Sequence, residues 1–239
     1  MKILCVIPSR IRSTRLARKP LLPIQGKPMI QWVYENASRC NILTKVVVAT
    51  DSEEISDVIT AIGGHVEMTD PHLPTGTDRV ALVAEKFPEM QVVINLQGDE
   101  PFIKPLMIEQ LIAPYLAGEL PEMTTLAHPL DMNKHADPGV VKVIVNTQGN
   151  AIYFSRTPIP YFRTQETAPV YHHMGLYAFR RDFLLRYPTL RQTPLEKTES
   201  LEQLRALEHG YTIRVCLTEQ GSLEINTQEE YEAAQEFLY

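Results

Sequence analysis

Cationic and hydroxyl side chains are concentrated in the ten residues from Arg10 to Lys19. Five of these residues are Arg or Lys, although the net charge of the whole chain is −6. Forked guanidinium groups and ammonium groups bind phosphate oxygens, and hydroxyl groups such as that of Ser13 add further donors. The run lacks the glycines of a Walker loop, so it is not the P-loop of an ATPase. It predicts a polyphosphate-binding loop, and the alternative is a solvated basic loop.

A carboxylate follows another apolar run further along the chain. Asp99 lies in the segment Gln97-Gly98-Asp99-Glu100-Pro101, directly after the run Val92–Leu96. Mg²⁺ in proteins is held by one or two carboxylates, with phosphates and waters as its remaining ligands. Asp99 is therefore a candidate Mg²⁺ ligand facing the basic loop. The alternative is a plain turn.

Two further segments place polar groups at expected helix starts. In Thr75-Gly76-Thr77-Asp78-Arg79, free backbone N–H groups and the small Gly76 could bind a base or a phosphate. An ordinary helix cap explains the same residues equally well. Asp51 or Ser52 is predicted to cap the helix that follows the run Lys45–Thr50.

The second half of the chain has polar residues among apolar neighbours. A guanidinium such as that of Arg156 suits a carboxylate, while His, Tyr, Glu and Gln side chains suit a polyhydroxylated sugar. Taken singly, each of these residues more often has a structural role. The candidates are Arg156, His172, His173, Tyr177, Glu202 and Gln203.

The elements that must position these residues follow a βαβα pattern. Short apolar runs at Ile3–Ile7, Lys45–Thr50 and Val92–Leu96 predict buried parallel strands. Helical spacing predicts four helices between and after them, namely Met29–Ser38, Glu53–Ile62, Arg79–Phe87 and Pro105–Ala117. The pattern is typical of an α/β fold with a doubly wound, mostly parallel sheet. Ligands of such sheets bind beyond the carboxyl ends of the strands, where the polar segments fall.

From about residue 121 the pattern changes. Four segments are strand-like, namely Met123–His128, Val140–Asn146, Ala151–Ser155 and His172–Phe179. We interpret residues 121–180 as a smaller, partly antiparallel extension of a single domain over residues 1–239. A helix over Glu196–His209, a strand over Thr212–Leu217 and a helix over Gln228–Leu238 are predicted to follow.

Composition excludes several classes of protein. The acidic balance argues against binding a nucleic acid polymer, which requires a basic surplus. Three distant cysteines fit neither a disulfide framework nor a zinc site, and they indicate a reducing, cytoplasmic location. No run reaches the roughly 18 apolar residues of a membrane span, so no membrane insertion is expected.

Taken in order, these segments resemble the CMP-Kdo synthetase family (3-deoxy-manno-octulosonate cytidylyltransferase) over nearly the whole chain. The matching stretches are Ile7–Arg10, Ser13–Leu16, Lys19–Leu21, Gly26–Ile30, Ala49–Asp51, Thr75–Arg79, Gln97–Pro101, Tyr153–Arg156, Pro158–Pro160, His173–Tyr177 and Leu201–Arg205. Each stretch is weak alone, but the ordered set is specific.

The resemblance implies a nucleotide-diphospho-sugar transferase-like fold and a homodimeric, Mg²⁺-dependent enzyme. The enzyme would condense CTP with the acidic sugar Kdo, release pyrophosphate and supply lipopolysaccharide synthesis. By this analogy the triphosphate is held by Arg10, Ser13 and Lys19, and the nucleotide is bordered by Thr75, Gly76, Thr77 and Arg79. Asp99 is the metal ligand, and the sugar acid is surrounded by Gln97, Arg156, His173, Tyr177, Glu202 and Gln203. Arg10, Lys19 and Asp99 are the expected catalytic residues.

Two departures from the family pattern stand out. Ala17 and Arg18 replace the usual Pro-Gly before the loop lysine. Asn226 stands where the family has a second metal-binding aspartate. If residues 224–227 form the short strand that the resemblance suggests, Glu224 shares a face with Asn226 and could supply the lost charge.

Two alternatives to this reading remain. The first is another CMP- or UDP-sugar-forming enzyme, or a Kdo relative with an amino group as the substrate. The second is a catalytically weak binding homologue, which the amide at Asn226 would favour.

Overall fold

The computed structural model describes residues 1–12, 16–164, 168–219 and 221–236. The chain forms two compact units, one of Met1–Glu109 with Ser222–Tyr239 and the other of Gln110–Gly221. The expectation of one domain over residues 1–239, with an extension at 121–180, stays a prediction.

The first unit is built on a parallel sheet. Its strand order is β6-β1-β4-β5, and every neighbouring pair is parallel. The strands are β1 (Ile3–Ser9), β4 (Lys45–Thr50), β5 (His65–Met68) and β6 (Val92–Asn95), and a small antiparallel hairpin is formed by β2 (Pro23–Ile24) and β3 (Lys27–Pro28). The predicted strands are confirmed, and the continuous burial of β1, β4 and β6 explains their apolar runs.

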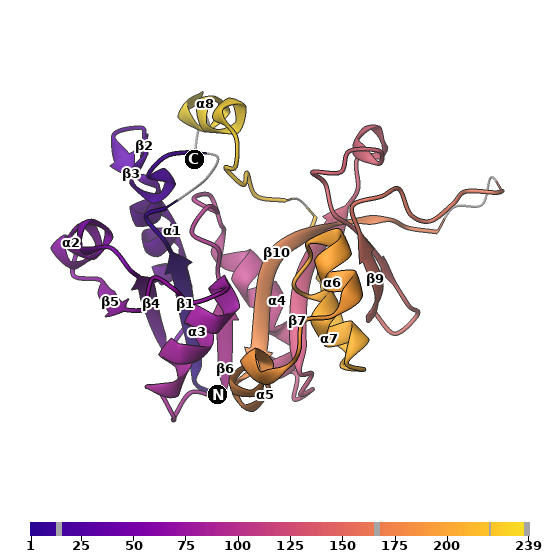
Figure 1. Cartoon of the computed structure of the whole chain (residues 1–239), viewed down its shortest axis with the longest axis horizontal. Coiled ribbons are helices and arrows are strands. Elements are labelled where there is room, and N and C mark those ends of the chain that lie inside the picture. Colours follow the sequence, from indigo (N-terminus) through magenta and orange to yellow (C-terminus); the bar gives the residue numbers. More distant parts are fainter. Residues whose placement is uncertain (13–15, 165–167, 220, 237–239) are drawn as a thin grey trace. The chain divides into compact units, whose positions relative to one another are not determined.

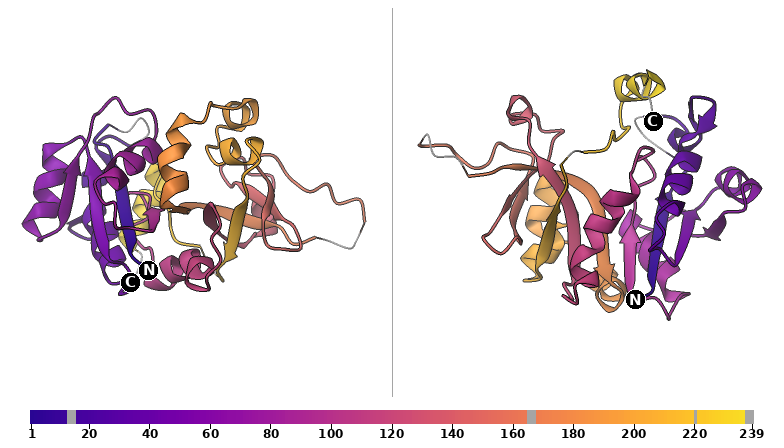
Figure 2. Two further views of the ribbon diagram at one scale, coloured as in Figure 1. Left: turned by 90° about the horizontal axis from the view of Figure 1, so that it is seen from below. Right: turned by 180° about the vertical axis from the view of Figure 1, so that it is seen from behind.

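Helices connect these strands. After β5 the chain returns past β1 to β6, and with right-handed crossovers this reversal places α3 on the face opposite α1 and α2. Figures 1 and 2 show helices on both faces of the sheet. The fold is therefore doubly wound, as predicted. The helices are α1 (Met29–Ser38), α2 (Glu53–Ala61), α3 (Gly76–Glu85), α4 (Pro105–Leu116) and α8 (Gln228–Glu236), with the 3-10 turn η1 (Lys19–Leu21), and the division between the units falls within α4.

The second unit has a mixed sheet. Strand β7 pairs antiparallel with β10 and parallel with β11, and β8 pairs antiparallel with β10 and β9. The predicted partly antiparallel pairing of these strands is confirmed. The strands are β7 (Met123–Pro129), β8 (Lys142–Val145), β9 (Ala151–Ser155), β10 (Tyr171–Arg180) and β11 (Ile213–Leu217). The helices are α5 (Arg181–Arg186), α6 (Pro194–Glu199) and α7 (Leu204–Glu208), with the 3-10 turns η2 (Met132–Lys134) and η3 (Tyr187–Thr189).

The predicted continuous helix over Glu196–His209 is wrong. Helix α6 ends at Glu199, and α7 begins only at Leu204. Ser200 between them has a φ of 52°, in the left-handed region, which ends an α-helix. The apolar spacing runs through both helices, so periodicity alone did not show the break.

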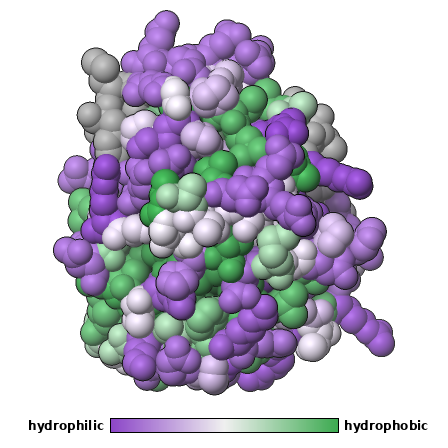
Figure 3. All heavy atoms as spheres, turned by 90° about the vertical axis from the view of Figure 1, so that its left-hand side faces the viewer, coloured by the Kyte–Doolittle hydropathy of each residue, from purple (hydrophilic) through white to green (hydrophobic). Residues whose placement is uncertain are grey.

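The surface is that of an ordinary globular chain. On the face turned toward the viewer in Figure 3, hydrophilic residues surround smaller hydrophobic areas. Single exposed apolar residues such as Ile62 and Met68 are normal on soluble surfaces. Within the part of the chain that the structure describes, none of the helices is both long and apolar enough to span a membrane.

Candidate active site

A cavity of about 320 Å³ opens at the carboxyl ends of β1 and β6. Both strands run in the same direction, so the residues that follow them meet at one edge of the sheet. The lining combines the basic loop, the start of α3 and the loop after β6. The lining residues are Pro8, Ser9, Arg10, Arg12, Lys19, Pro20, Gly76, Gln97, Gly98 and Asp99.

Gly98 allows the two strand-end loops to approach each other closely. A Cβ atom at this position would lie 3.2 Å from the backbone oxygen of Pro8, closer than side chains normally pack. A larger residue would therefore push the loop that carries Asp99 away from the basic loop. A glycine at position 98 therefore lets the Gln97–Pro101 segment pack closely against β1.

The basic loop presents donors to the cavity. Arg10 and Arg12 both line it, and Nη2 of Arg10 is anchored 3.4 Å from the backbone oxygen of Pro74. The buried hydroxyl of Ser9 has no hydrogen-bond partner among the described residues. Sequence reasoning missed Ser9, although its place at the carboxyl end of a buried strand was a usable signal. Ser13 lies outside the described residues.

Lys19 and Asp99 form an ion pair at this cavity. Nζ of Lys19 lies 2.7 Å from Oδ2 of Asp99 and donates a second hydrogen bond to Oδ1 of Asn226 at 2.9 Å. The Lys19 and Asp99 side chains are 13% and 21% exposed. The other carboxylate oxygen of Asp99, Oδ1, is buried and has no hydrogen-bond partner among the described residues.

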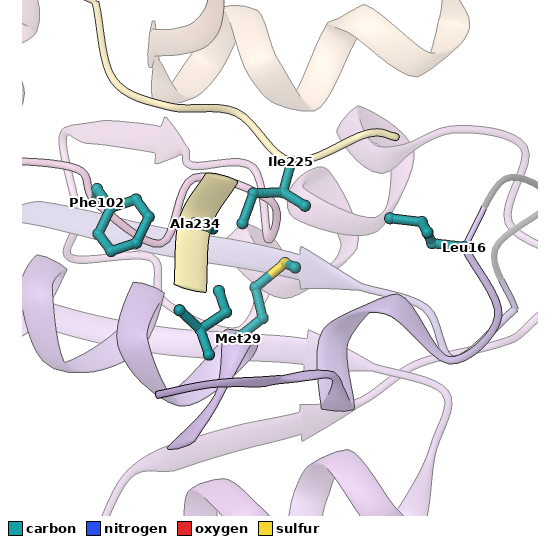
Figure 4. Close-up of a cluster of buried hydrophobic side chains, with 6 residues drawn as sticks. Leu16, Met29, Phe102, Ile225 and Ala234 are labelled. Carbon is teal, nitrogen blue, oxygen red and sulfur yellow. The ribbon is translucent and has the colours of Figure 1, made fainter. Parts of the chain in front are cut away.

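The segment that carries Asn226 is held at the site by its backbone and by apolar packing. The Ile225 N–H donates to the backbone oxygen of Asp99 at 3.1 Å. In Figure 4, Ile225 packs in a buried cluster between the loop residue Leu16 and Ala234 of α8. The structure therefore places the segment of Asn226 beside the loop of Asp99. A role of Asn226 in metal binding stays a prediction.

The expected strand over residues 224–227 is wrong, because none of these residues is in regular secondary structure. Glu224 and Asn226 nevertheless meet, since the Asn226 side-chain Nδ2 donates to Oε1 of Glu224. The segment follows the Asp99 loop through the Ile225 N–H instead of pairing with a neighbouring strand.

Glu100 is a buried carboxyl group that sequence reasoning did not single out. Its side chain accepts a hydrogen bond from the Ser222 hydroxyl. Burial, and then the nearby negative charge of Glu224, raise the pKa of Glu100 to about 8. Its place beside Asp99 was the only available signal in the sequence. The Ser222 contact ties the C-terminal segment to the Asp99 loop a second time.

The start of α3 is a capping arrangement. Thr75 is the N-cap, and its side chain and that of Asp78 form a reciprocal capping box. The Arg79 side chain is fully buried, with its guanidinium near Thr69, the Asp70 backbone and Asp51. Burial lowers the pKa of this guanidinium. A nucleotide contact by Arg79 stays a prediction.

Ser52 is the N-cap of α2. Of the two candidate cap residues, Asp51 and Ser52, it is therefore Ser52 that caps the helix. Near the cavity, the Gln97 side chain donates to Asn95, and Asn95 donates to the Thr77 hydroxyl. This chain of polar contacts links the loop after β6 to the first turn of α3.

In the second unit, three of the predicted sugar-binding residues form one buried group. The Tyr177 hydroxyl donates to Oε1 of Gln203 at 3.0 Å, and the Tyr177 ring packs on the His173 ring. Nε2 of His173 lies 2.9 Å from the Thr125 hydroxyl. Burial lowers the pKa of His173 to about 3, so the ring is neutral at physiological pH. Nε2 of Gln203 is buried without a hydrogen-bond partner among the described residues, which leaves its N–H donors available to a ligand.

Arg156 is held by backbone carbonyls of the same unit. Its Nε donates to the Glu199 oxygen at 2.9 Å and its Nη1 to the Pro138 oxygen at 3.0 Å. The Glu199 carboxylate in turn accepts the Arg156 N–H and the Ser155 hydroxyl. Glu202 is in the α6–α7 connection, where its backbone oxygen accepts the Tyr187 hydroxyl.

The Asp99 site fits a hard cation by its donor chemistry. Among the described residues no group of three or more His, Cys, Asp or Glu side chains is placed to hold a metal ion. Mg²⁺ does not require such a group, because it is commonly held by one or two carboxylates with phosphate and water. The unpartnered, buried Oδ1 of Asp99 is a ligand of the required kind.

Comparisons with known proteins agree with this geometry. A family model described as cytidylyltransferase matches residues 4–214. The 3-deoxy-manno-octulosonate cytidylyltransferase of Acaryochloris marina is 56% identical over 240 positions, covering 100% of this chain and 98% of the relative. The enzyme of the same name from Synechococcus elongatus is 50% identical, covering 98% of this chain and 97% of the relative.

A solved structure gives the same result for the fold. It is the structure of a CMP:2-keto-3-deoxy-manno-octonic acid synthetase complexed with CTP, with 42% identity and a TM-score of 0.92. The match covers 99% of this chain and 100% of that one. The chain therefore belongs to the 3-deoxy-manno-octulosonate cytidylyltransferase (CMP-Kdo synthetase) family.

Proposed function

We propose that the protein condenses CTP with Kdo to give CMP-Kdo and pyrophosphate, and that it supplies activated sugar to lipopolysaccharide synthesis in the cytoplasm. The observation that supports this best is the cavity at the carboxyl ends of β1 and β6, where Arg10, Arg12 and Lys19 lie with the carboxylate of Asp99. Cations next to one carboxylate suit a triphosphate bound together with a metal ion.

The triphosphate is held by the basic loop. Arg10 and Lys19 contribute charge at the cavity. By the resemblance to the family, Ser13 contributes a hydroxyl donor. Charge-assisted contacts of this kind stabilise the pyrophosphate as it leaves. The start of α3 borders the nucleotide, with Gly76 at the cavity wall, and Thr75, Thr77 and Arg79 in the same turn.

Mg²⁺ is the proposed cofactor, with Asp99 as its primary ligand. Asn226 adds a neutral amide oxygen, and Glu224 holds the other end of that amide. When bound, Mg²⁺ neutralises phosphate charge and activates the attacking hydroxyl. Asp99 and Asn226 contribute by fixing where the cation lies, because the Ile225 N–H ties their backbones together.

The sugar acid is bound by side chains of the second unit. Arg156 binds the sugar carboxylate. The hydroxyl groups of the sugar exchange hydrogen bonds with the neutral His173, with Tyr177 and with Gln203. Glu202 lies in the same connection as Gln203. The unpartnered Nε2 of Gln203 supports this assignment, because a buried donor costs free energy until a ligand accepts its hydrogen bond.

The sugar's anomeric oxygen attacks the α-phosphorus of CTP in line, and pyrophosphate leaves from the opposite side. The protein contributes positioning and electrostatic stabilisation, without a covalent intermediate on the chain. A homodimer is the proposed assembly, by analogy with the family.

Pyrophosphate release with CTP and Kdo, with and without Mg²⁺, tests the activity. A panel of other nucleoside triphosphates, sialic acid and an amino-substituted Kdo tests the substrate assignment. Lys19→Ala is the low-activity control, because a charged phosphate contact is worth ~1.5–3 kcal/mol, or roughly 10- to 150-fold in rate. Pyrophosphate release with another pair and none with CTP and Kdo would overturn the assignment.

A further inference from the structure

The ammonium group of Lys19 lies where two cation ligands converge. Its Nζ is 2.7 Å from Oδ2 of Asp99 and 2.9 Å from Oδ1 of Asn226. Asp99 and Asn226 are the two side chains that the proposed function assigns to Mg²⁺, and the unpartnered Oδ1 of Asp99 belongs to the same carboxylate as the oxygen that Lys19 contacts. The protein's own cation therefore lies between the two proposed metal ligands.

One carboxylate and one amide are in direct contact with that ammonium. Asp99 supplies one negative charge, and Asn226, being an amide, supplies none. Glu224 adds a second nearby carboxylate that interacts electrostatically with Lys19 and Asp99. Its hydrogen bond is to the Asn226 amide nitrogen, which leaves the amide oxygen directed at Lys19. A divalent ion next to the ammonium is repelled, and the amide offers no extra charge to offset the repulsion.

The ligand backbones are tied together, whereas the ammonium is held only by side-chain contacts at the end of a long side chain. The Ile225 N–H bonds the Asp99 backbone, and Ile225 is completely buried with Leu16 and Met29 in the cluster of Figure 4. The long Lys19 side chain, by contrast, ends at a cavity that Arg10 and Arg12 also line. A polyphosphate in that cavity would offer the ammonium new acceptors.

We infer that Lys19 is a resident cation that excludes a divalent ion from Asp99 and Asn226 until a nucleoside triphosphate draws the ammonium away. The inference rests on the proposed nucleotide and metal site. It sets an order of binding, in which the nucleotide or the metal–nucleotide complex enters before Asp99 accepts a metal. Free Mg²⁺ alone does not fill the site.

Binding of Mn²⁺ alone to the nucleotide-free protein tests this, read from water-proton relaxation and from the loss of free-ion electron resonance. Lys19→Met should bind Mn²⁺ at least about tenfold more tightly than wild type, because the competing charge is gone. Lys27→Met is the control for net charge, since Lys27 pairs with Glu35 elsewhere in the same unit, and it should bind as wild type does. The added Asp99→Asn change should abolish the gain. Equal Mn²⁺ affinity in wild type and Lys19→Met overturns the inference.

A measurement on wild type decides the matter even when Lys19→Met fails to fold, as judged by circular dichroism. With a chelator present, calorimetry should show CTP binding without metal, whereas Mn²⁺ without CTP should show no Asp99-dependent binding at submillimolar concentration. Tight Mn²⁺ binding by wild type that Asp99→Asn removes overturns the inference. Product analysis tests the proposed function separately. If Mn²⁺ binding follows the expected pattern but no CMP-sugar forms, the proposed function is wrong and the inference about Lys19 stands.

Discussion

The guanidinium of Arg205 donates two hydrogen bonds to the carboxylate of Glu196, from Nε at 2.9 Å and from Nη2 at 2.5 Å. The two side chains are only 4% and 7% exposed. The pair joins α7 to α6 across the break at Ser200, and Glu202 and Gln203 lie in the connection between them. The ion pair therefore positions residues of the proposed sugar site.

Glu196→Gln should lower the free energy of unfolding by about 3–5 kcal/mol, because it leaves the Arg205 charge buried without a counter-charge. Urea unfolding measures the loss. Asp182→Asn is the matched control, since Asp182 pairs with Arg180 at the surface and its side chain is 58% exposed. That change should cost less than about 1 kcal/mol. Similar losses in both variants would contradict the structural role of the buried pair.

Arg18→Gly should stabilise the protein relative to Arg18→Ala by about 1 kcal/mol. Arg18 has a φ of 54°, in the left-handed region where a Cβ atom is unfavourable. Both variants lose the exposed contact with Glu54, so their difference isolates the backbone. Thermal or urea unfolding of the two variants measures it. An alanine variant at least as stable as the glycine variant would show that the turn relaxes.

Much of the fold could be predicted because its signals are local. The apolar runs of β1, β4 and β6 and the spacing of α1 mark buried elements directly. The break between α6 and α7 could not be predicted, since it depends on the left-handed Ser200 and on a tertiary ion pair. Neither leaves a periodic trace in the sequence.

The site divides in the same way. Arg10, Lys19 and Asp99 were found because strand-end loops of a parallel sheet converge, and the structure does place all three at one cavity. The contact of Lys19 with Asn226 spans more than two hundred residues of sequence and depends on how Ile225 packs. Spacing could not reveal it, nor the burial of Glu100 against Ser222.

Arg156→Lys should raise the KM for the sugar by roughly tenfold and leave the KM for CTP unchanged. Lysine keeps the charge but loses the forked donors that pair with a carboxylate. Because Arg156 also bonds the backbone oxygens of Glu199 and Pro138, unfolding should be measured alongside. Arg163→Lys, at an exposed arginine of the same unit, is the control. An equal rise in the KM for CTP would move Arg156 to the nucleotide side.

Stability should fall as the pH drops below about 6.5, in part because of His173. Burial lowers the pKa of His173 from 6.5 to about 3, so between these values the unfolded chain takes up a proton that the folded chain does not. By about pH 5 the loss from this group is about 2 kcal/mol. His172, with its pKa lowered to about 4 by burial, adds a loss of the same sign.

Urea unfolding at about pH 7 and about pH 5 checks this. His173→Gln should lose about 2 kcal/mol less than wild type over that interval. If wild type and variant show the same pH dependence, a group other than His173 takes up the proton on unfolding.

Glu224→Gln should shift the Mg²⁺ dependence of activity to higher concentration. The Glu224 carboxylate can only accept from the Asn226 amide, so it fixes the amide with its oxygen toward Lys19 and the proposed cation. A glutamine at 224 can donate as well as accept, so this orientation is lost together with one negative charge. The alternative is that Glu224 is only a solvated acid.

Asn226→Asp separates the two readings. It restores a carboxylate at the position itself, a ligand that Mg²⁺ prefers to an amide. In the double variant it should return the Mg²⁺ curve of Glu224→Gln to the wild-type position or to a lower concentration. Glu230→Gln controls for charge, because Glu230 bonds the backbone N–H groups of Asn226 and Thr227 and not the side-chain amide. If Glu224→Gln leaves the Mg²⁺ curve unchanged, Glu224 does not compensate for the missing aspartate, and the amide at Asn226 acts alone beside Asp99.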